Sequence, residues 1–215
     1  MSRWLLALLV ILVAAALAVW GFRQTSPDIA NLTSGAVPTA PTVVMVDADR
    51  LQQALAAGPW VSAGQGEPVL WVVGHRSCAE CVSYLRAEAD ALADAGVEVR
   101  VLLFAPDDAG PEERAVLAEI GARRSWSTLS DFVSTEEAAF YADRTFPPAA
   151  DPVRAAIVAA GRLARDEIVA VLQANGFEAR YPVLVWRGDA AGEPRLMMGD
   201  SDAGRRAVRD ALADG

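Results

Sequence analysis

Two apolar runs joined by an amphipathic helix constrain the fold of this chain more than any other feature. The first run, in EPVLWVVGH, covers 68–75 and has the pattern of a strand buried on both faces. A helix is predicted from Cys78 to Ala95, ended by Gly96, and its apolar stripe consists of Val82, Leu85, Ala89 and Leu92. The second strand, VEVRVLLFA, covers 97–105. This order predicts a βαβ unit with two parallel strands and a right-handed crossover.

Further helices are predicted on both sides of this unit. A short strand at 43–46 and a helix at 49–57 precede it. A long helical stretch at about 107–175 follows, and we interpret it as an insert between strands. Helix starts within the stretch are indicated by Pro111, by Ser134 with Glu137, and by Asp151 followed by Pro152.

The last part of the chain predicts a hairpin and a closing helix. YPVLVW at 181–186 has the pattern of a strand, RGDAAGEP that of a turn, and RLMMG that of the partner strand. Ser201 is expected to cap a final helix through Leu212. Because a hairpin joins antiparallel strands and a βαβ unit joins parallel ones, the fold class is α/β with a mixed sheet flanked by helices.

The N-terminal residues predict a membrane anchor and a tether. Residues 4–22 contain no charged side chain, and a helix over this run spans roughly 28 Å, close to a bilayer hydrocarbon core. We expect a transmembrane anchor at 1–22, with a cleaved signal peptide as the alternative, and a flexible tether at 23–42. Both alternatives export the domain at 43–215.

The overall charge of the chain bears on its partners. Its 19 Lys and Arg residues are outnumbered by 28 Asp and Glu residues, which gives a formal net charge of -9. Binding to a phosphate backbone needs a basic face, and the acidic balance argues against one. We therefore predict no nucleic-acid partner.

The two cysteines, Cys78 and Cys81, lie at the start of the predicted helix of the βαβ unit. Free backbone N–H groups and the helix dipole favour a thiolate over a thiol at this position. Cys81 is three residues further along the same helical face, within disulfide reach of Cys78. Thiol–disulfide exchange needs this arrangement: Cys78 attacks a disulfide, and Cys81 resolves the mixed disulfide that forms.

A structural disulfide and a metal site are the alternatives to redox chemistry at the cysteine pair. A structural disulfide across two residues closes a very short loop and restrains little of the unfolded chain. A metal site formed by His75, Cys78 and Cys81 has ligand-like spacing, but structural zinc requires four ligands. A copper(I) site with soft ligands remains open. We favour redox chemistry at the pair, without a metal or a cofactor.

His75 and Glu80 are candidate modulators of the thiols. A carboxylate at Glu80 disfavours a neighbouring thiolate, although acids are also common as solvated residues in a first helical turn. His75 has a pKa range suited to proton transfer, although a lone histidine at a strand end is more often a polar loop residue.

Two other groups of side chains have a structural interpretation that we favour. The aromatic residues of the insert either line an apolar substrate groove or, as we favour, pack its core: Trp126, Phe132, Phe140, Tyr141 and Phe146. The Arg205-Arg206 pair is interpreted as a solvated helix start.

The chain resembles the thioredoxin superfamily. The resemblance is carried by VLWVVGHRSCAEC, by the βαβ unit around it, and by YPVLVW with its hairpin and C-terminal helix. It covers about 43–215, and a helical insert in this place is similar to exported Dsb-type disulfide oxidoreductases. Val72 stands where thioredoxin has a buried acid, which makes DsbC- and DsbG-like catalytic domains the closer match. The resemblance implies that Pro182 is the family's cis-proline, facing the cysteines.

The resemblance also implies a function and a location. The chain is expected to be a membrane-tethered thiol–disulfide oxidoreductase or isomerase acting on cysteines of exported proteins, with a further protein as its redox partner. Tyr181 and Pro182 are the expected substrate-binding residues, because the backbone there can pair with an extended substrate. The expected location is the bacterial inner membrane, as a single-pass protein with its catalytic domain in the periplasm. A copper(I) chaperone of the cell envelope and a redox-inactive thioredoxin-like scaffold are the alternatives.

Overall fold

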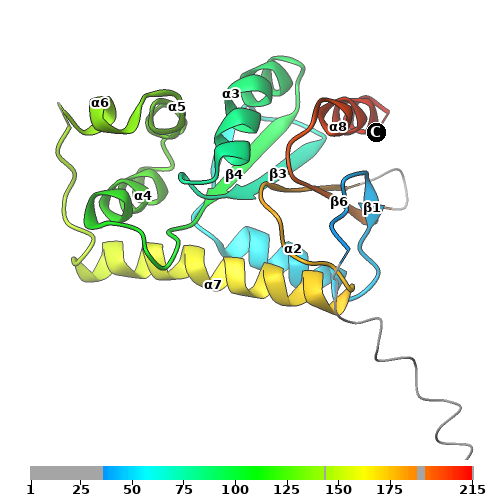
Figure 1. Cartoon of the computed structure of the whole chain (residues 1–215), viewed down its shortest axis with the longest axis horizontal. Helices are drawn as coiled ribbons and strands as arrows, with labels where there is room; N and C mark the ends of the chain where they lie inside the picture. Colours follow the sequence, from blue (N-terminus) through cyan, green and yellow to red (C-terminus); the bar gives the residue numbers. More distant parts are fainter. Residues whose placement is uncertain (1–35, 143, 188–191, 215) are drawn as a thin grey trace, which may run out of the picture. The chain divides into compact units, whose positions relative to one another are not determined.

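A six-stranded mixed sheet organises the part of the chain that the computed structural model describes, residues 36–142, 144–187 and 192–214. The strands lie in the order β1-β6-β5-β3-β4-β2 (Figure 1). Their bounds are Thr42–Val43 for β1, Val61–Ala63 for β2, Val69–Gly74 for β3, Glu98–Leu103 for β4, Val183–Arg187 for β5 and Pro194–Met198 for β6. The predicted mixed α/β fold is confirmed, and its architecture is thioredoxin-like.

Helices cover both faces of this sheet (Figure 1). One face carries α2 and α7, and the other carries α3 and α8. Of the remaining helices, α5 packs against α3, α6 against α5, and α4 against α7 and α5. Their bounds are Ala48–Ala57 for α2, Ala79–Asp94 for α3, Pro111–Arg123 for α4, Trp126–Ser134 for α5, Glu137–Ala142 for α6, Pro152–Ala174 for α7 and Asp202–Ala213 for α8. The predicted helical stretch at 107–175 therefore comprises four helices, of which α7 covers the sheet.

The predicted βαβ unit is present as β3, α3 and β4. Strands β3 and β4 are parallel, and β5 pairs with the other edge of β3 in antiparallel orientation. Leu70 and Val72 pack toward α3, whereas Trp71 and Val73 pack toward α2 and α7. Because both faces of β3 are buried, nearly every position in it is apolar. This central strand holds the cysteine segment at its C-terminal end.

The helix caps show where local sequence signals succeed. Asp151 accepts hydrogen bonds from Val153 N and Arg154 N at the start of α7. Ser201 accepts one from Gly204 N at the start of α8. Both caps were predicted, and both satisfy N–H groups that a helix start leaves free.

Three local predictions differ from the structure. Ser134 does not cap α6; it ends α5, and the Glu136 carboxylate instead accepts from Ala139 N at 3.1 Å. Strand β1 is shorter than the predicted 43–46. Strand β2 was not predicted, because three residues are too few to show an alternating pattern; it pairs with β4 in antiparallel orientation.

The predicted anchor at 1–22 and most of the predicted tether lie outside the described residues. No helix among residues 36–142, 144–187 and 192–214 combines the length and apolarity that crossing a membrane requires. Residues 36–42, at the end of the predicted tether, are hydrogen-bonded to the domain. Ala36 N donates to Gly176 O at 3.2 Å, and Met198 N donates to Pro38 O at 2.7 Å.

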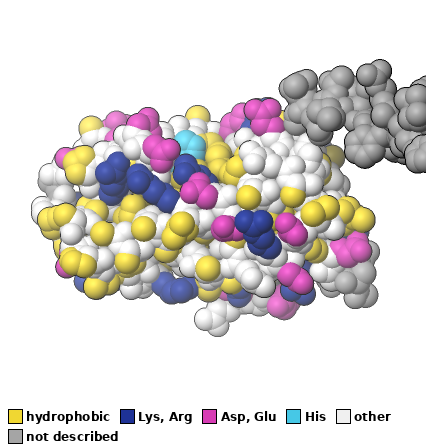
Figure 2. All heavy atoms as spheres, turned by 90° about the horizontal axis from the view of Figure 1, so that it is seen from below, with side chains coloured by type: hydrophobic (Ala, Val, Ile, Leu, Met, Phe, Trp, Pro, Cys, Tyr) yellow, Lys and Arg dark blue, Asp and Glu magenta, His cyan; other side chains and the backbone are white. Residues whose placement is uncertain are grey.

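The face formed by α2 and α7 carries a mixed surface. Figure 2 shows arginine and acidic side chains interspersed on it, with hydrophobic side chains between them. Arg50 on α2 and Glu167 on α7 form an ion pair with an N–O distance of 2.5 Å. Both side chains are about half exposed, so the pair contributes little to stability.

Candidate active site

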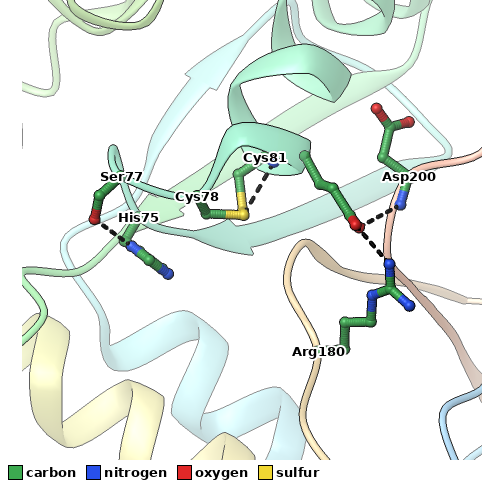
Figure 3. The surroundings of a disulfide bond; sticks show 7 residues. His75, Ser77, Cys78, Cys81, Arg180 and Asp200 are labelled. Carbon is green, nitrogen blue, oxygen red and sulfur yellow. Dashed lines mark hydrogen bonds and ion pairs between the residues drawn. A yellow bond between two sulfur atoms is a disulfide. The ribbon is translucent and has the colours of Figure 1, made fainter.

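A disulfide joins Cys78 and Cys81 where β3 passes into α3 (Figure 3). Cys78 is the N-cap residue of α3, and its Sγ accepts a hydrogen bond from Cys81 N at 3.1 Å. Its side chain is partly exposed, whereas Cys81 is only 1% exposed. Cys78 is therefore the cysteine that another molecule can reach, and the N-terminus of α3 stabilises its thiolate form.

The last residue of β3, Gly74, makes room for the second sulfur. A Cβ placed on Gly74 would lie 2.6 Å from Cys81 Sγ and 3.0 Å from Cys81 Cβ. The distance to the sulfur is shorter than real Cβ contacts and the distance to Cys81 Cβ is very tight, so a side chain at 74 and the Cys81 sulfur cannot both occupy these positions. Gly74 was not among the predicted site residues, although a glycine that ends a buried strand is a signal of close backbone approach.

His75 lies on one side of the disulfide, within an aromatic cluster. Its Nδ1 is 2.9 Å from Ser77 Oγ, and its ring centroid is 5.3 Å from that of Phe104 and 5.6 Å from that of Tyr181. Burial lowers the pKa of His75 from its ordinary value; Asp108 opposes this shift. The imidazole is therefore uncharged at neutral pH and does not act as a cation beside Cys78.

Residues 180 and 181 contact the segment that carries the cysteines. Tyr181 contacts His75, and Arg180 forms an ion pair with Glu80, so the two segments meet at two points. The Tyr181–Pro182 peptide bond is cis, which confirms that prediction; a second cis bond, Glu67–Pro68, was not predicted. Pro182 O accepts from Gly199 N at 2.9 Å. Substrate binding by Tyr181 and Pro182 stays a prediction.

Glu80, the second candidate modulator, is held in place rather than free in solvent. One carboxylate oxygen is 2.5 Å from an Arg180 guanidinium nitrogen, and the other accepts from Asp200 N at 3.2 Å. Figure 3 shows Arg180 on the side of the disulfide opposite His75. Arg180 was not among the predicted site residues, because no signal in a single sequence pairs residues 80 and 180.

Behind the site, a network of charges ties α3 to α8. Arg205 Nε donates to the Asp200 carboxylate at 2.6 Å, and Arg209 donates to both oxygens of Glu88 at 2.7 Å. Burial, followed by the nearby Glu88 carboxylate, raises the pKa of Tyr84. The interpretation of Arg205 as solvated is wrong, because its side chain is 17% exposed and pairs with a buried acid.

A groove of about 890 Å³ lies along α3, next to the cysteine segment. Ser77 and Ala79, the neighbours of Cys78, line one end, and the residues between α5 and α6 form the opposite wall. Arg76 and Arg86 hold that wall in place by donating to Thr135 O at 2.9 Å and Val133 O at 2.7 Å.

This groove is not the apolar one considered from the sequence. The aromatic side chains of the insert pack into the main core or against it, in agreement with the favoured interpretation: Trp126, Phe132, Phe140, Tyr141 and Phe146. The groove instead combines two arginines with two glutamates, Glu136 and Glu137. A polypeptide could therefore meet hydrogen-bonding groups on both walls.

Among the described residues, no group of three or more His, Cys, Asp or Glu side chains is arranged to hold a metal ion. His75 is hydrogen-bonded to Ser77, and the two cysteines form a disulfide. In this oxidised form the two sulfurs proposed for the copper(I) alternative are joined to each other and are not free thiolate ligands.

Comparison with solved structures found several chains of similar fold, one of which is described as a thiol–disulfide exchange protein. The chain is similar to alpha-DsbA2 from Wolbachia pipientis, with 15% identity, 79% of this chain and 95% of that chain covered, and a TM-score of 0.47. It is similar to ScsC from Proteus mirabilis in a compact conformation, with 9% identity, coverage of 99% and 97%, and a TM-score of 0.48.

A third similar structure is a periplasmic thioredoxin-like protein from Salmonella enterica serovar Typhimurium. It has 16% identity, covers 76% of this chain and 96% of its own, and has a TM-score of 0.43. No protein-family model and no curated protein matches the chain. Similarities of this size establish neither a family nor a function. The thioredoxin-like assignment rests on this chain's own strand order, its Cys-x-x-Cys helix and the proline before β5.

Proposed function

We propose that this chain is a thiol–disulfide oxidoreductase that acts on cysteines of exported polypeptides. One observation carries the proposal: the partly exposed Cys78 Sγ caps α3 and accepts from Cys81 N, while Cys81 is buried behind it. An attacking thiol needs exposure and a stabilised thiolate, and a resolving thiol needs proximity and shielding. The pair provides both.

The exchange is written for the reduced protein acting on a substrate disulfide. The Cys78 thiolate attacks one substrate sulfur, so a mixed disulfide forms and the other substrate sulfur leaves as a thiolate. Cys81 then gives up its proton and attacks Cys78 Sγ, which releases the second substrate thiolate and closes the Cys78–Cys81 disulfide. Two electrons pass from the protein to the substrate, and the same steps in reverse oxidise a substrate dithiol.

The experiment that tests this function compares the folded protein with a peptide of the sequence RSCAECV. We expect the protein, in a glutathione redox buffer, to exchange disulfides with an unfolded cysteine-containing polypeptide much faster than the peptide does. The reason is that only the folded chain has a helix N-terminus at Cys78. Equal rates would contradict the proposal. The redox equilibrium with glutathione also indicates whether oxidation or reduction is favoured.

We place the polypeptide side of the mixed disulfide in the groove along α3, because the neighbours of Cys78 line it. Replacing Ala87, an exposed lining residue, with tryptophan should slow exchange with polypeptides about tenfold by filling the groove, while exchange with glutathione is unchanged. The matched control is Ala91→Trp, one turn further along α3, exposed and outside the groove lining. Equal rates for the two variants would remove the groove from the proposal.

We further propose that the domain is exported and tethered to the bacterial inner membrane through residues 4–22, facing the periplasm. The uncharged run supports this location. The intact mass of protein extracted from membranes should include these residues, and a mature chain that begins after them would contradict the anchor.

A further inference from the structure

Glu80 connects the cysteine segment with two distant parts of the chain. It is one of the two residues between the cysteines and lies in the first turn of α3. Arg180 reaches one carboxylate oxygen at 2.5 Å, and Asp200 N reaches the other at 3.2 Å. Figure 3 shows Arg180 and Asp200 on the same side of the disulfide, away from His75. The position of the Glu80 charge is therefore fixed from two sides.

The backbone after β6 is shaped to make this contact. Gly199 has φ +78, and a Cβ there would lie 3.2 Å from a Glu80 oxygen and 3.3 Å from Arg180 Nε. The Asp200 carboxylate points away from Glu80 and forms an ion pair with Arg205, with an N–O distance of 2.5 Å. Asp200 thus offers its N–H to Glu80, and its own negative charge is paired elsewhere.

The charge of Glu80 matters because of the thiolate two residues away. A carboxylate near Cys78 disfavours the thiolate form, and a cation near it has the opposite effect. His75 is uncharged at neutral pH, and Arg76 is turned toward α5, where it donates to Thr135 O. The cation that pairs with Glu80 is the guanidinium of Arg180, which donates a hydrogen bond to the Glu80 carboxylate.

We propose that Arg180 is a positioning residue that neutralises Glu80 and thereby favours the thiolate of reduced Cys78. The inference rests on the proposed function and adds a role for a residue outside the Cys-x-x-Cys segment. Arg180 also precedes the Tyr181–Pro182 segment directly, so the same ion pair connects the thiols to the predicted substrate-binding backbone.

Four variants test the inference: Arg180→Gln, Glu80→Gln, the two together, and Arg180→Lys. The readout is the pH midpoint of the Cys78 thiolate titration in the reduced protein, followed by ultraviolet absorbance and by the alkylation rate. Arg180→Gln should move the midpoint to higher pH and slow alkylation at neutral pH about threefold, the size expected for an exposed ion pair. Glu80→Gln should move it to lower pH.

The combined variant separates charge balance from structural damage. With both charges removed, the midpoint should return close to that of the wild-type protein, because neither an unpaired carboxylate nor an unpaired cation remains. Arg180→Lys should lie between wild type and Arg180→Gln, since lysine keeps the charge and loses the planar fork. If the combined variant keeps the full shift of Arg180→Gln, the inference is overturned.

Arg209→Gln is the matched control. It removes a similarly exposed arginine, 47% against 53% for Arg180, that pairs with α3 through Glu88, two helical turns after Cys81. Its titration midpoint should not move, and an equal shift in Arg209→Gln would also overturn the inference. The titration uses the reduced protein alone, without substrate. A normal titration response in a protein that fails to exchange disulfides would therefore refute the proposed function and leave this inference standing.

Discussion

Replacing Cys81 with serine is expected to convert a transient mixed disulfide at Cys78 into a stable one. In the wild-type protein the resolving sulfur is held beside the attacking one, with 5.2 Å between the two Cα atoms. Such an intramolecular step has a high effective concentration, so the substrate is released quickly. Serine cannot form the closing bond, and the trapped complexes should be visible on non-reducing gels and identifiable by mass spectrometry.

The reciprocal variant defines the roles of the two sulfurs. Cys78→Ser leaves Cys81 as the sole thiol, and Cys81 is 1% exposed beneath the first turn of α3. Trapping should be lost, and turnover should fall by about two orders of magnitude or more, as for removal of any nucleophile. Complexes trapped through Cys81 in this variant would reverse the assigned roles, and trapping in neither variant would contradict the exchange mechanism.

Local sequence signals predicted the elements that carry the cysteines. The apolar run of β3, the stripe of α3 and the hairpin of β5 and β6 each follow from the spacing of neighbouring residues, and all are present. Ser201 and Asp151 were identified as caps because a cap bonds to N–H groups two or three residues away. All the residues that define such a strand, helix or cap lie within a short stretch of sequence.

Contacts between distant segments could not be predicted in the same way. Glu80 and Arg180 are 100 residues apart, and Arg209 and Glu88 are 121 apart. Each of these residues is of a type that is common at solvated helix or loop positions. Only the folded structure brings the two partners of each pair together. The interpretation of Arg205 as a solvated base therefore omitted its ion pair with Asp200, and the prediction of Glu80 as a modulator did not include its partner Arg180.

A second large effect is expected from adding one methyl group at Gly74. In Gly74→Ala the new Cβ would meet Cys81 Sγ at 2.6 Å, so the disulfide or β3 must shift. Overpacking of this kind in a core costs roughly 1–3 kcal/mol. We expect the free energy of unfolding of the oxidised protein, measured by denaturant titration, to fall by about this amount. The equilibrium with glutathione should shift toward the reduced protein, because reduction lets the two sulfurs separate.

Gly110→Ala is the matched control, because the nearest atom to its added Cβ is 3.6 Å away and its φ of -66° is accessible to alanine. Because Gly110 is the N-cap residue of α4, where alanine is less favoured than glycine, it should lower the free energy of unfolding by no more than about 1 kcal/mol. Combining Gly74→Ala with Cys81→Ala removes the clashing sulfur, and the penalty of the glycine change should then shrink, which a double-mutant cycle measures. If Gly74→Ala is as harmless as Gly110→Ala, the close packing of the second sulfur against the end of β3 is refuted. A penalty that persists undiminished without the sulfur would instead place the steric conflict at the Cys81 Cβ, which lies 3.0 Å from the added methyl group.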